Sequence, residues 1–161
     1  MSQGEGSSRR RIPGPLVIVT AAAIAWVAAV AVPSLLNAVA RGKQRRTMGD
    51  MRTIATALER WSMDSRSYLA TSRTGEEQRQ DLQRILVPTY TRKLPVTDGW
   101  GHPFAIVLAA TEYTVTSYGR GGVPDSVEPQ SVDLGGGTTS FDADIIFSTG
   151  SFVQFPDYGG D

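Results

Sequence analysis

Residues 12–40 of the chain read IPGPLVIVTAAAIAWVAAVAVPSLLNAVA and carry no charged side chain. Because an α-helix rises about 1.5 Å per residue, this stretch is long enough to cross a hydrocarbon core about 30 Å thick. Arginines fill positions 9–11 before it, and a basic cluster follows it at positions 41–46. We therefore predict a transmembrane helix over residues 12–40, preceded by a disordered basic segment over residues 1–11.

The same stretch has some features of a cleaved signal sequence. Arginines precede it, and Ala38-Val39-Ala40 is typical of a cleavage site. However, the apolar core of a signal peptide spans only about 7–15 residues. We prefer an uncleaved span, with cleavage after Ala40 as the alternative. Orientation stays open, because positive charge is similar on both sides of the span.

The helical pattern continues beyond the span. Apolar residues recur there at helical spacing, at Met51, Ile54, Ala55, Leu58 and Trp61. Pro33 removes one backbone hydrogen bond, so we expect a kink there and not the end of the helix. The pattern predicts one helix from near Pro15 to near Met63, with an apolar stripe on its second half that the rest of the chain must cover.

Residues 41–161 have the size of one small domain and mix helical with strand patterns. A short helix is predicted from near Gly75, with acidic residues in its first turn, to the proline at position 88. Two hairpins follow, over residues 104–108 with 113–117 and over residues 145–147 with 152–155. The sequence thus predicts an α+β fold, with a long N-terminal α-helix packed against a small antiparallel β-sheet built from two hairpins.

Turn-forming residues fill two other regions. In residues 94–104, Asp-Gly and two prolines fix the turns, and we expect Trp100 to be buried and His102 to lie on the surface. Residues 121–140 predict a long loop rich in Gly, Pro, Asp and Ser. A loop of that length is unusual in a compact domain unless another group organises it.

Charge is balanced over the whole chain, with 16 basic and 16 acidic residues, but it is unevenly distributed. Residues 41–93 hold 12 basic and 6 acidic residues, a net charge of +6, whereas residues 121–161 hold seven acidic residues and no basic one. This argues against a nucleic-acid binder, which carries a basic excess. It suits head-to-tail self-association or cation binding at the acidic end, with ordinary solvated surface charge as the alternative.

Few residues are available for catalysis. The chain has no cysteine and a single histidine, so neither a Cys-His nucleophile nor a multi-His metal site can be built. A Ser, His and Asp set lacks the nucleophile-elbow pattern, and the glycines at positions 119–122 are not followed by a helical pattern. We therefore expect a protein that is not an enzyme.

Residues 32–38 (VPSLLNA), 40–47 (ARGKQRRT) and 50–58 (DMRTIATAL) follow one another along the predicted long helix. In this order they resemble the N-terminal helix of type IV pilins and pseudopilins. The Leu-Pro and Asp-Gly-Trp-Gly-His-Pro-Phe of residues 94–104, then residues 113–122 and the Asp-Ala-Asp-Ile of residues 142–145, resemble the G-type major pseudopilin of type II secretion.

The resemblance implies a pilin-like globular domain over residues 41–161, packed on the outer half of a bent helix. It also implies that residues 12–40 serve as an assembly helix as well as a membrane span. The implied partners are other copies of the chain in a helical filament, other pseudopilins, inner-membrane proteins of the secretion machinery, and membrane lipid. The implied topology is a single pass through a bacterial inner membrane, with a cytoplasmic N-terminus and a periplasmic or extracytoplasmic globular domain.

The chain departs from the family pattern at its processing site. Counting back from Pro33 by the family spacing places the peptidase junction between Arg11 and Ile12, and the usual glutamate at Leu16. Neither the glycine nor the glutamate of the family is present. We assign Leu16 and Pro33 to assembly within the membrane, without the buried carboxylate, which is costly in lipid. An uncleaved, membrane-anchored binding module that does not assemble is the alternative.

The resemblance also implies a Ca²⁺ site that ties the loop after the second strand to the Asp-x-Asp segment. The candidate ligands are the carbonyl of Tyr118 and the carboxylates of Asp125, Asp142 and Asp144, with Asp125 substituting for a family aspartate that corresponds to Gly121. Ca²⁺ takes 6–8 oxygen ligands. On an extended chain, aspartates two positions apart point to the same face. Exposed acids beside a flexible loop are the alternative.

Overall fold

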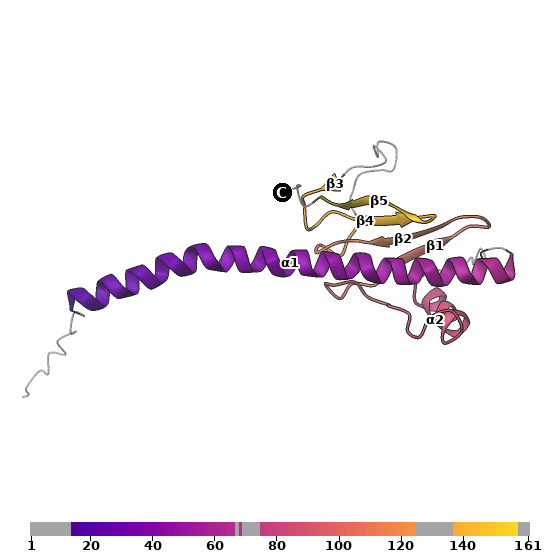
Figure 1. The fold of residues 1–161 in the computed structure, drawn as a ribbon, viewed down its shortest axis with the longest axis horizontal. Helices are drawn as coiled ribbons and strands as arrows, with labels where there is room; N and C mark the ends of the chain where they lie inside the picture. The colour runs from indigo at the N-terminus through magenta and orange to yellow at the C-terminus, as the bar shows by residue number, and fades with distance from the viewer. Residues whose placement is uncertain (1–13, 67, 69–74, 125–136, 158–161) are drawn as a thin grey trace, which may run out of the picture. The chain divides into compact units, whose positions relative to one another are not determined.

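The computed structural model describes residues 14–66, 68, 75–124 and 137–157, although not the side chains of residues 15 and 16. The chain forms two compact units, residues 1–38 and residues 39–161, and helix α1 (Pro15–Ser65) contributes to both. Helix α2 (Gly75–Leu86) belongs to the second unit (Figure 1). The strands are β1 (Ala105–Leu108), β2 (Tyr113–Ser117), β3 (Gly137–Thr138), β4 (Ile145–Ser148) and β5 (Ser151–Pro156). The predicted α+β fold is confirmed.

In the first unit, α1 is helical throughout and includes Pro33, so the predicted continuation through this proline is confirmed. Every described side chain from residue 17 to residue 38 is exposed, and Trp26 at 77% is among the most exposed. Within the described residues, α1 is the one helix that is both long enough and apolar enough to cross a membrane. It is therefore a candidate membrane anchor.

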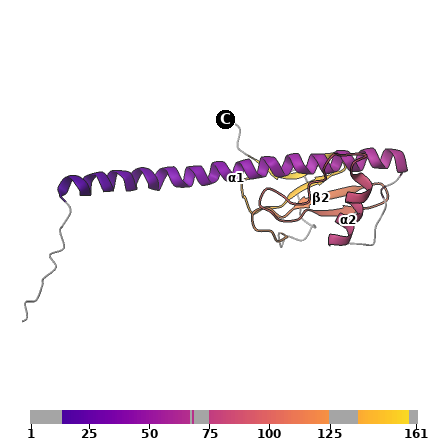
Figure 2. The ribbon, with the colours of Figure 1, turned by 90° about the horizontal axis from the view of Figure 1, so that it is seen from below.

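In the second unit, α1 presents the predicted apolar stripe to a core. All five residues of the stripe are buried, Trp61 among them. They pack in one cluster with Leu82 and Leu86 of α2 and with inward-facing residues of the sheet, such as Val115 and Phe147. Figures 1 and 2 show α2 and the sheet beside this half of α1. Burial of the stripe, together with the apolar residues that cover it, stabilises this unit.

The sheet has the strand order β1-β2-β4-β5-β3. Strands β1 and β2 form one antiparallel hairpin and β4 and β5 the other, so both predicted hairpins are confirmed. The hairpins join where β2 pairs with β4, with Val115 opposite Phe147. Alternate residues of β2 are buried, which places its inward face on α1.

Strand β3 departs from the expectation of a loop over residues 121–140, since it pairs in parallel with β5. It has only two residues, so it leaves no alternating pattern that could identify it as a strand. A Cβ atom on Gly137 would lie 2.4 Å from the Cβ atom of Asp157. Glycine therefore permits the close pairing that closes this edge of the sheet.

The expected burial of Trp100 is wrong. Trp100 is half-buried and lies outside the core, whereas Asp98, two residues earlier, is only 3% exposed. Leu94 and Phe104, at the two ends of this stretch, supply its apolar contribution to the core. Asp98 takes the inner position because its carboxylate is needed to hold the backbone of the turn.

Candidate functional site

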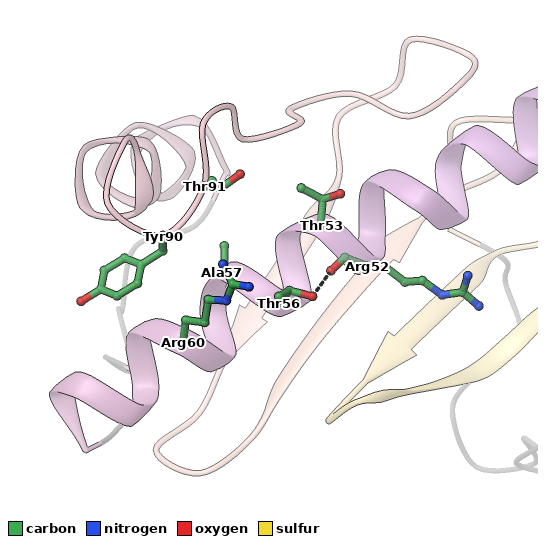
Figure 3. Close-up of a pocket in the computed structure, with 7 residues that line it drawn as sticks. All are labelled: Arg52, Thr53, Thr56, Ala57, Arg60, Tyr90 and Thr91. Carbon is green, nitrogen blue, oxygen red and sulfur yellow. Dashed lines mark hydrogen bonds between the residues drawn. The ribbon is translucent and has the colours of Figure 1, made fainter.

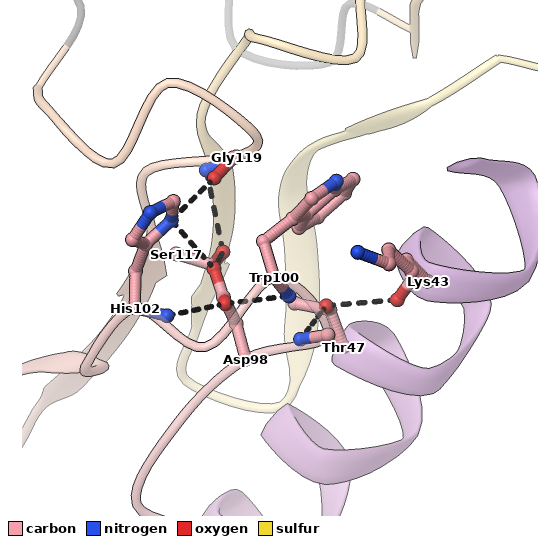
Figure 4. A network of polar contacts seen from close by, with 8 residues as sticks. Lys43, Thr47, Asp98, Trp100, His102, Ser117 and Gly119 are labelled. Carbon is pink, nitrogen blue, oxygen red and sulfur yellow. Dashed lines mark hydrogen bonds and ion pairs between the residues drawn. The ribbon is translucent and has the colours of Figure 1, made fainter. Parts of the chain in front are cut away.

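A buried aspartate organises the turn between α2 and β1. Oδ1 of Asp98 accepts hydrogen bonds from the backbone N–H groups of Trp100 and His102, both at 2.9 Å. Oδ2 accepts one from the hydroxyl of Ser117 at the end of β2, at 2.7 Å. A buried carboxylate is costly unless several donors compensate it, and here three donors do so. We call Asp98, Trp100, His102 and Ser117 the Asp98 cluster (Figure 4).

The Asp98 cluster is fastened to α1 through Thr47. The backbone N–H of Gly99 donates to Oγ1 of Thr47 at 2.9 Å, and that hydroxyl donates to the carbonyl of Lys43, also at 2.9 Å (Figure 4). A Cβ atom on Gly99 would lie 2.5 Å from the same carbonyl oxygen. The glycine thus lets the turn reach the helix backbone, which fixes the turn on α1.

His102 is not the surface residue that we expected. It is half-buried, with Nδ1 lying 3.0 Å from the carbonyl oxygen of Gly119 and 3.9 Å from Oδ2 of Asp98. A Cβ atom on Gly122 would lie 2.7 Å from the imidazole ring. His102 therefore links the turn to the segment that follows β2.

The cluster brings a serine, a histidine and an aspartate together, but not as a nucleophile relay. The hydroxyl of Ser117 donates directly to Asp98, and Ser117 is completely buried. In a relay, the serine hydroxyl would donate to the histidine and face a substrate. These three residues hold the backbones of two segments together.

The predicted calcium residues lie in different surroundings. Asp142 is exposed and forms a two-point ion pair with Arg120, with Nε to Oδ1 at 2.9 Å and a terminal nitrogen to Oδ2 at 2.7 Å. The hydrogen bond from Arg120 holds the pKa of Asp142 below its ordinary value. Asp144, by contrast, is 8% exposed. Residues 141–143 form a bend and not an extended strand, so the extended backbone on which the expected shared face depends is absent here.

The other two calcium candidates add little to a site. The carbonyl of Tyr118 accepts a hydrogen bond from the backbone N–H of Gly122 at 3.0 Å. Asp125 lies outside the described residues. Among the residues that the structure describes, no group of three or more acidic or histidine side chains is arranged to hold a metal ion. The described residues therefore fit a Ca²⁺ site poorly, because Ca²⁺ takes 6–8 oxygen ligands.

A second polar link that the sequence did not reveal joins α1 to the sheet. The phenol of Tyr113 on β2 donates to Oε1 of Glu59 at 2.5 Å and accepts from the backbone N–H of Gly150 at 3.1 Å. Burial, and then the hydrogen bond to Glu59, raise the pKa of Tyr113 well above its ordinary value. Glu59 lies in a helical pattern among polar residues, and nothing in that pattern distinguishes it from a solvated acid.

An open groove of about 270 Å³ runs beside the buried half of α1 (Figure 3). Its lining is polar and positively charged, and comprises Arg52, Thr53, Thr56, Ala57, Arg60, Tyr90 and Thr91. The hydroxyls of Thr53 and Thr56 donate to carbonyls of their own helix. The guanidinium of Arg52 turns toward β5, where it lies 5.1 Å from the centre of the Phe152 ring. The groove is an exposed basic surface and not an enclosed chamber.

Comparison with known proteins finds a match to one protein family. The family model of type II secretion system (T2SS) protein G matches residues 34–135, which are more than half of the chain. No curated protein and no solved structure matches the chain. The match contains the buried half of α1, α2, the Asp98 cluster and the first hairpin, and it ends before Asp142. Proteins of this family are structural pseudopilins of the secretion apparatus, and the chain belongs to the family of type II secretion system protein G.

Proposed function

We propose that this protein is a structural subunit of a type II secretion filament, or of a related pilus, and that it assembles through the N-terminal part of α1. One observation carries the proposal. Every described side chain from residue 17 to residue 38 is exposed, and most of these side chains are apolar. An apolar surface of this length is stable only in lipid or against other apolar surfaces.

The second unit supports the proposal because it is complete without that stretch. Its core lies between Met51 and Phe147, and both the stripe on α1 and the inward face of the sheet are buried. The apolar stretch of residues 17–38 is therefore not needed to fold the second unit. It remains available for lipid and for the same stretch of other copies of the chain.

Assembly in this chain would rest on apolar packing. The resemblance places a glutamate at Leu16, and an uncharged residue at that position cannot pair with the N-terminus of a neighbour. Helices in lipid associate through close van der Waals packing, to which small residues contribute. Alanines are frequent between residues 21 and 31. They give neighbouring helices a surface on which to approach closely.

The proposal extends to partners and topology. The family match favours contacts with other pseudopilins and with inner-membrane proteins of the secretion machinery. We propose a single pass through the inner membrane, with the N-terminus in the cytoplasm and the second unit on the other side. Contact with lipid follows from the exposed apolar stretch.

The departures at the processing site favour a second candidate, an uncleaved membrane-anchored module that does not assemble. Leu16 replaces the family glutamate, and the residue immediately before Ile12 is Arg11 and not glycine. The two candidates predict different N-termini. Processing and assembly predict a protein that begins near residue 12 or residue 15, whereas a static anchor predicts an intact Met1. Intact-mass spectrometry of the protein from native membranes distinguishes them.

Cross-linking tests assembly directly. Formaldehyde applied to native membranes should produce a ladder of species that contain more than two copies of the chain. Leu35→Ala, which reduces the apolar surface of the first unit, should shorten the ladder. Val107→Ala is the matched control, because Val107 is similarly exposed, at 65% against 66%, but lies on β1. A monomer alone, or equal effects of both variants, would contradict assembly through α1.

A further inference from the structure

We propose that the guanidinium of Arg120 supplies the positive charge that joins the turn after β2 to the segment before β4, in the place where the resemblance to pseudopilins implies Ca²⁺. The inference concerns how the second unit is held together. It does not depend on whether the chain assembles into a filament.

The first observation is the geometry of the ion pair. Arg120 follows β2 and Asp142 precedes β4, so the pair bridges two segments that are 22 positions apart in the chain. Two parallel contacts of 2.9 and 2.7 Å match the planar fork of a guanidinium to both oxygens of one carboxylate. Both carboxylate oxygens of Asp142 are therefore engaged by an organic cation.

The second observation is direct contact between the two backbones. The N–H of Arg120 donates to the carbonyl of Phe141 at 2.9 Å. Gly119 has a positive φ of 58°, and a Cβ atom there would lie 2.7 Å from the carbonyl oxygens of both Asp142 and Ala143. The segments thus meet without an intervening group, whereas a coordinated ion lies between its ligand oxygens at about 2.3–2.6 Å from each.

The third observation is the set of groups around this contact. The resemblance places an aspartate at Gly121, so one expected carboxylate is missing beside the residue that carries the guanidinium. The carbonyl of Tyr118, another candidate ligand, already accepts from Gly122. A permanent positive charge at Arg120 also repels a divalent cation at this position. The missing carboxylate at Gly121 and the guanidinium of Arg120 both favour a link between the two segments that needs no metal ion.

The first experiment measures thermal unfolding of the full chain in a neutral detergent, with excess Ca²⁺ or with a calcium chelator. We expect the same Tm in both conditions. A Tm that falls in the chelator and recovers with Ca²⁺ but not with Mg²⁺ would overturn the proposal, since it would show that a resident Ca²⁺ ion stabilises the fold.

The second experiment tests the ion pair with Arg120→Gln, Asp142→Asn and the double variant. Each single variant should lower Tm by about 2–4 °C, and the double variant should lower it no further than either single one, because they remove the same link. Arg84→Gln is the matched control, because the ion pair of Arg84 with Asp81 is long, at 3.8 Å, and lies within α2. The Tm of this control variant should equal that of the wild type. Additive losses in the double variant would show that the two side chains act separately and would refute the proposal.

Discussion

The two halves of α1 have the same secondary structure but opposite surroundings. From residue 17 to residue 38 the helix is exposed on all sides, whereas the stripe from Met51 to Trp61 is buried beneath the sheet and α2. The first half has no polar face, and the second half alternates apolar with charged residues. The comparison shows that one continuous helix can combine an exposed apolar half, which is a candidate membrane anchor, with a half whose apolar stripe is covered by a protein core.

The largest expected effect tests this difference directly. Leu58→Ala removes a fully buried side chain from the core and should lower the free energy of unfolding by about 2–5 kcal/mol. Leu36→Ala makes the same change on the exposed half and should alter it by less than about 0.5 kcal/mol. Urea unfolding of both variants in neutral detergent, followed by near-UV circular dichroism, measures the two values. Similar losses would mean that the exposed half also belongs to the core.

The Asp98 cluster gives a smaller effect with an internal control. Asp98→Ala leaves two backbone N–H groups and the Ser117 hydroxyl without their acceptor, and we expect a loss of about 3 kcal/mol. Ser117→Ala removes one of those donors and should cost about 1 kcal/mol. The same urea unfolding measures both variants. Equal losses would show that the backbone bonds of the turn contribute nothing.

The link between Glu59 and Tyr113 should depend on pH. The pKa of Tyr113 is raised by folding, so its contribution to stability is complete below the unfolded pKa of about 10 and is lost as pH rises through the folded pKa. Tyr113→Phe should cost about 1 kcal/mol at neutral pH, because Glu59 and Gly150 lose their hydrogen bonds to the phenol. The difference between wild type and variant should narrow above pH 10. Unfolding measured across the alkaline range checks this, and a constant difference would contradict it.

The sequence predicted the elements whose patterns are local. The length of the uncharged stretch and the spacing of apolar residues predicted α1 through Pro33, and alternation predicted the hairpins that became β1 with β2 and β4 with β5. The sequence did not predict β3. A strand of two residues is too short to show an alternating pattern, and its pairing partner β5 lies far from it in the sequence.

The candidate site was less predictable. We predicted that Trp100 would be the buried residue of the turn before β1, because aromatic side chains often fill such positions. Asp98 is buried there instead, because its carboxylate oxygens accept hydrogen bonds from backbone N–H groups of its own turn and from the hydroxyl of Ser117 on β2. Likewise, the spacing of Asp142 and Asp144 suggested a shared face on an extended chain, whereas residues 141–143 form a bend in the structure. Hydrogen-bond partners of this kind are set by the path of the chain.

By itself, the sequence determined the two kinds of helix surface, the hairpins and the resemblance that the family match later supported, because hydrophobic periodicity and length are written into neighbouring residues. Only the tertiary structure decided that Asp98 lies inside, that Thr47 receives the turn, and that Arg120 meets Asp142. The physical reason is that a polar side chain is placed by the partners that satisfy it, and those partners come from distant parts of the chain.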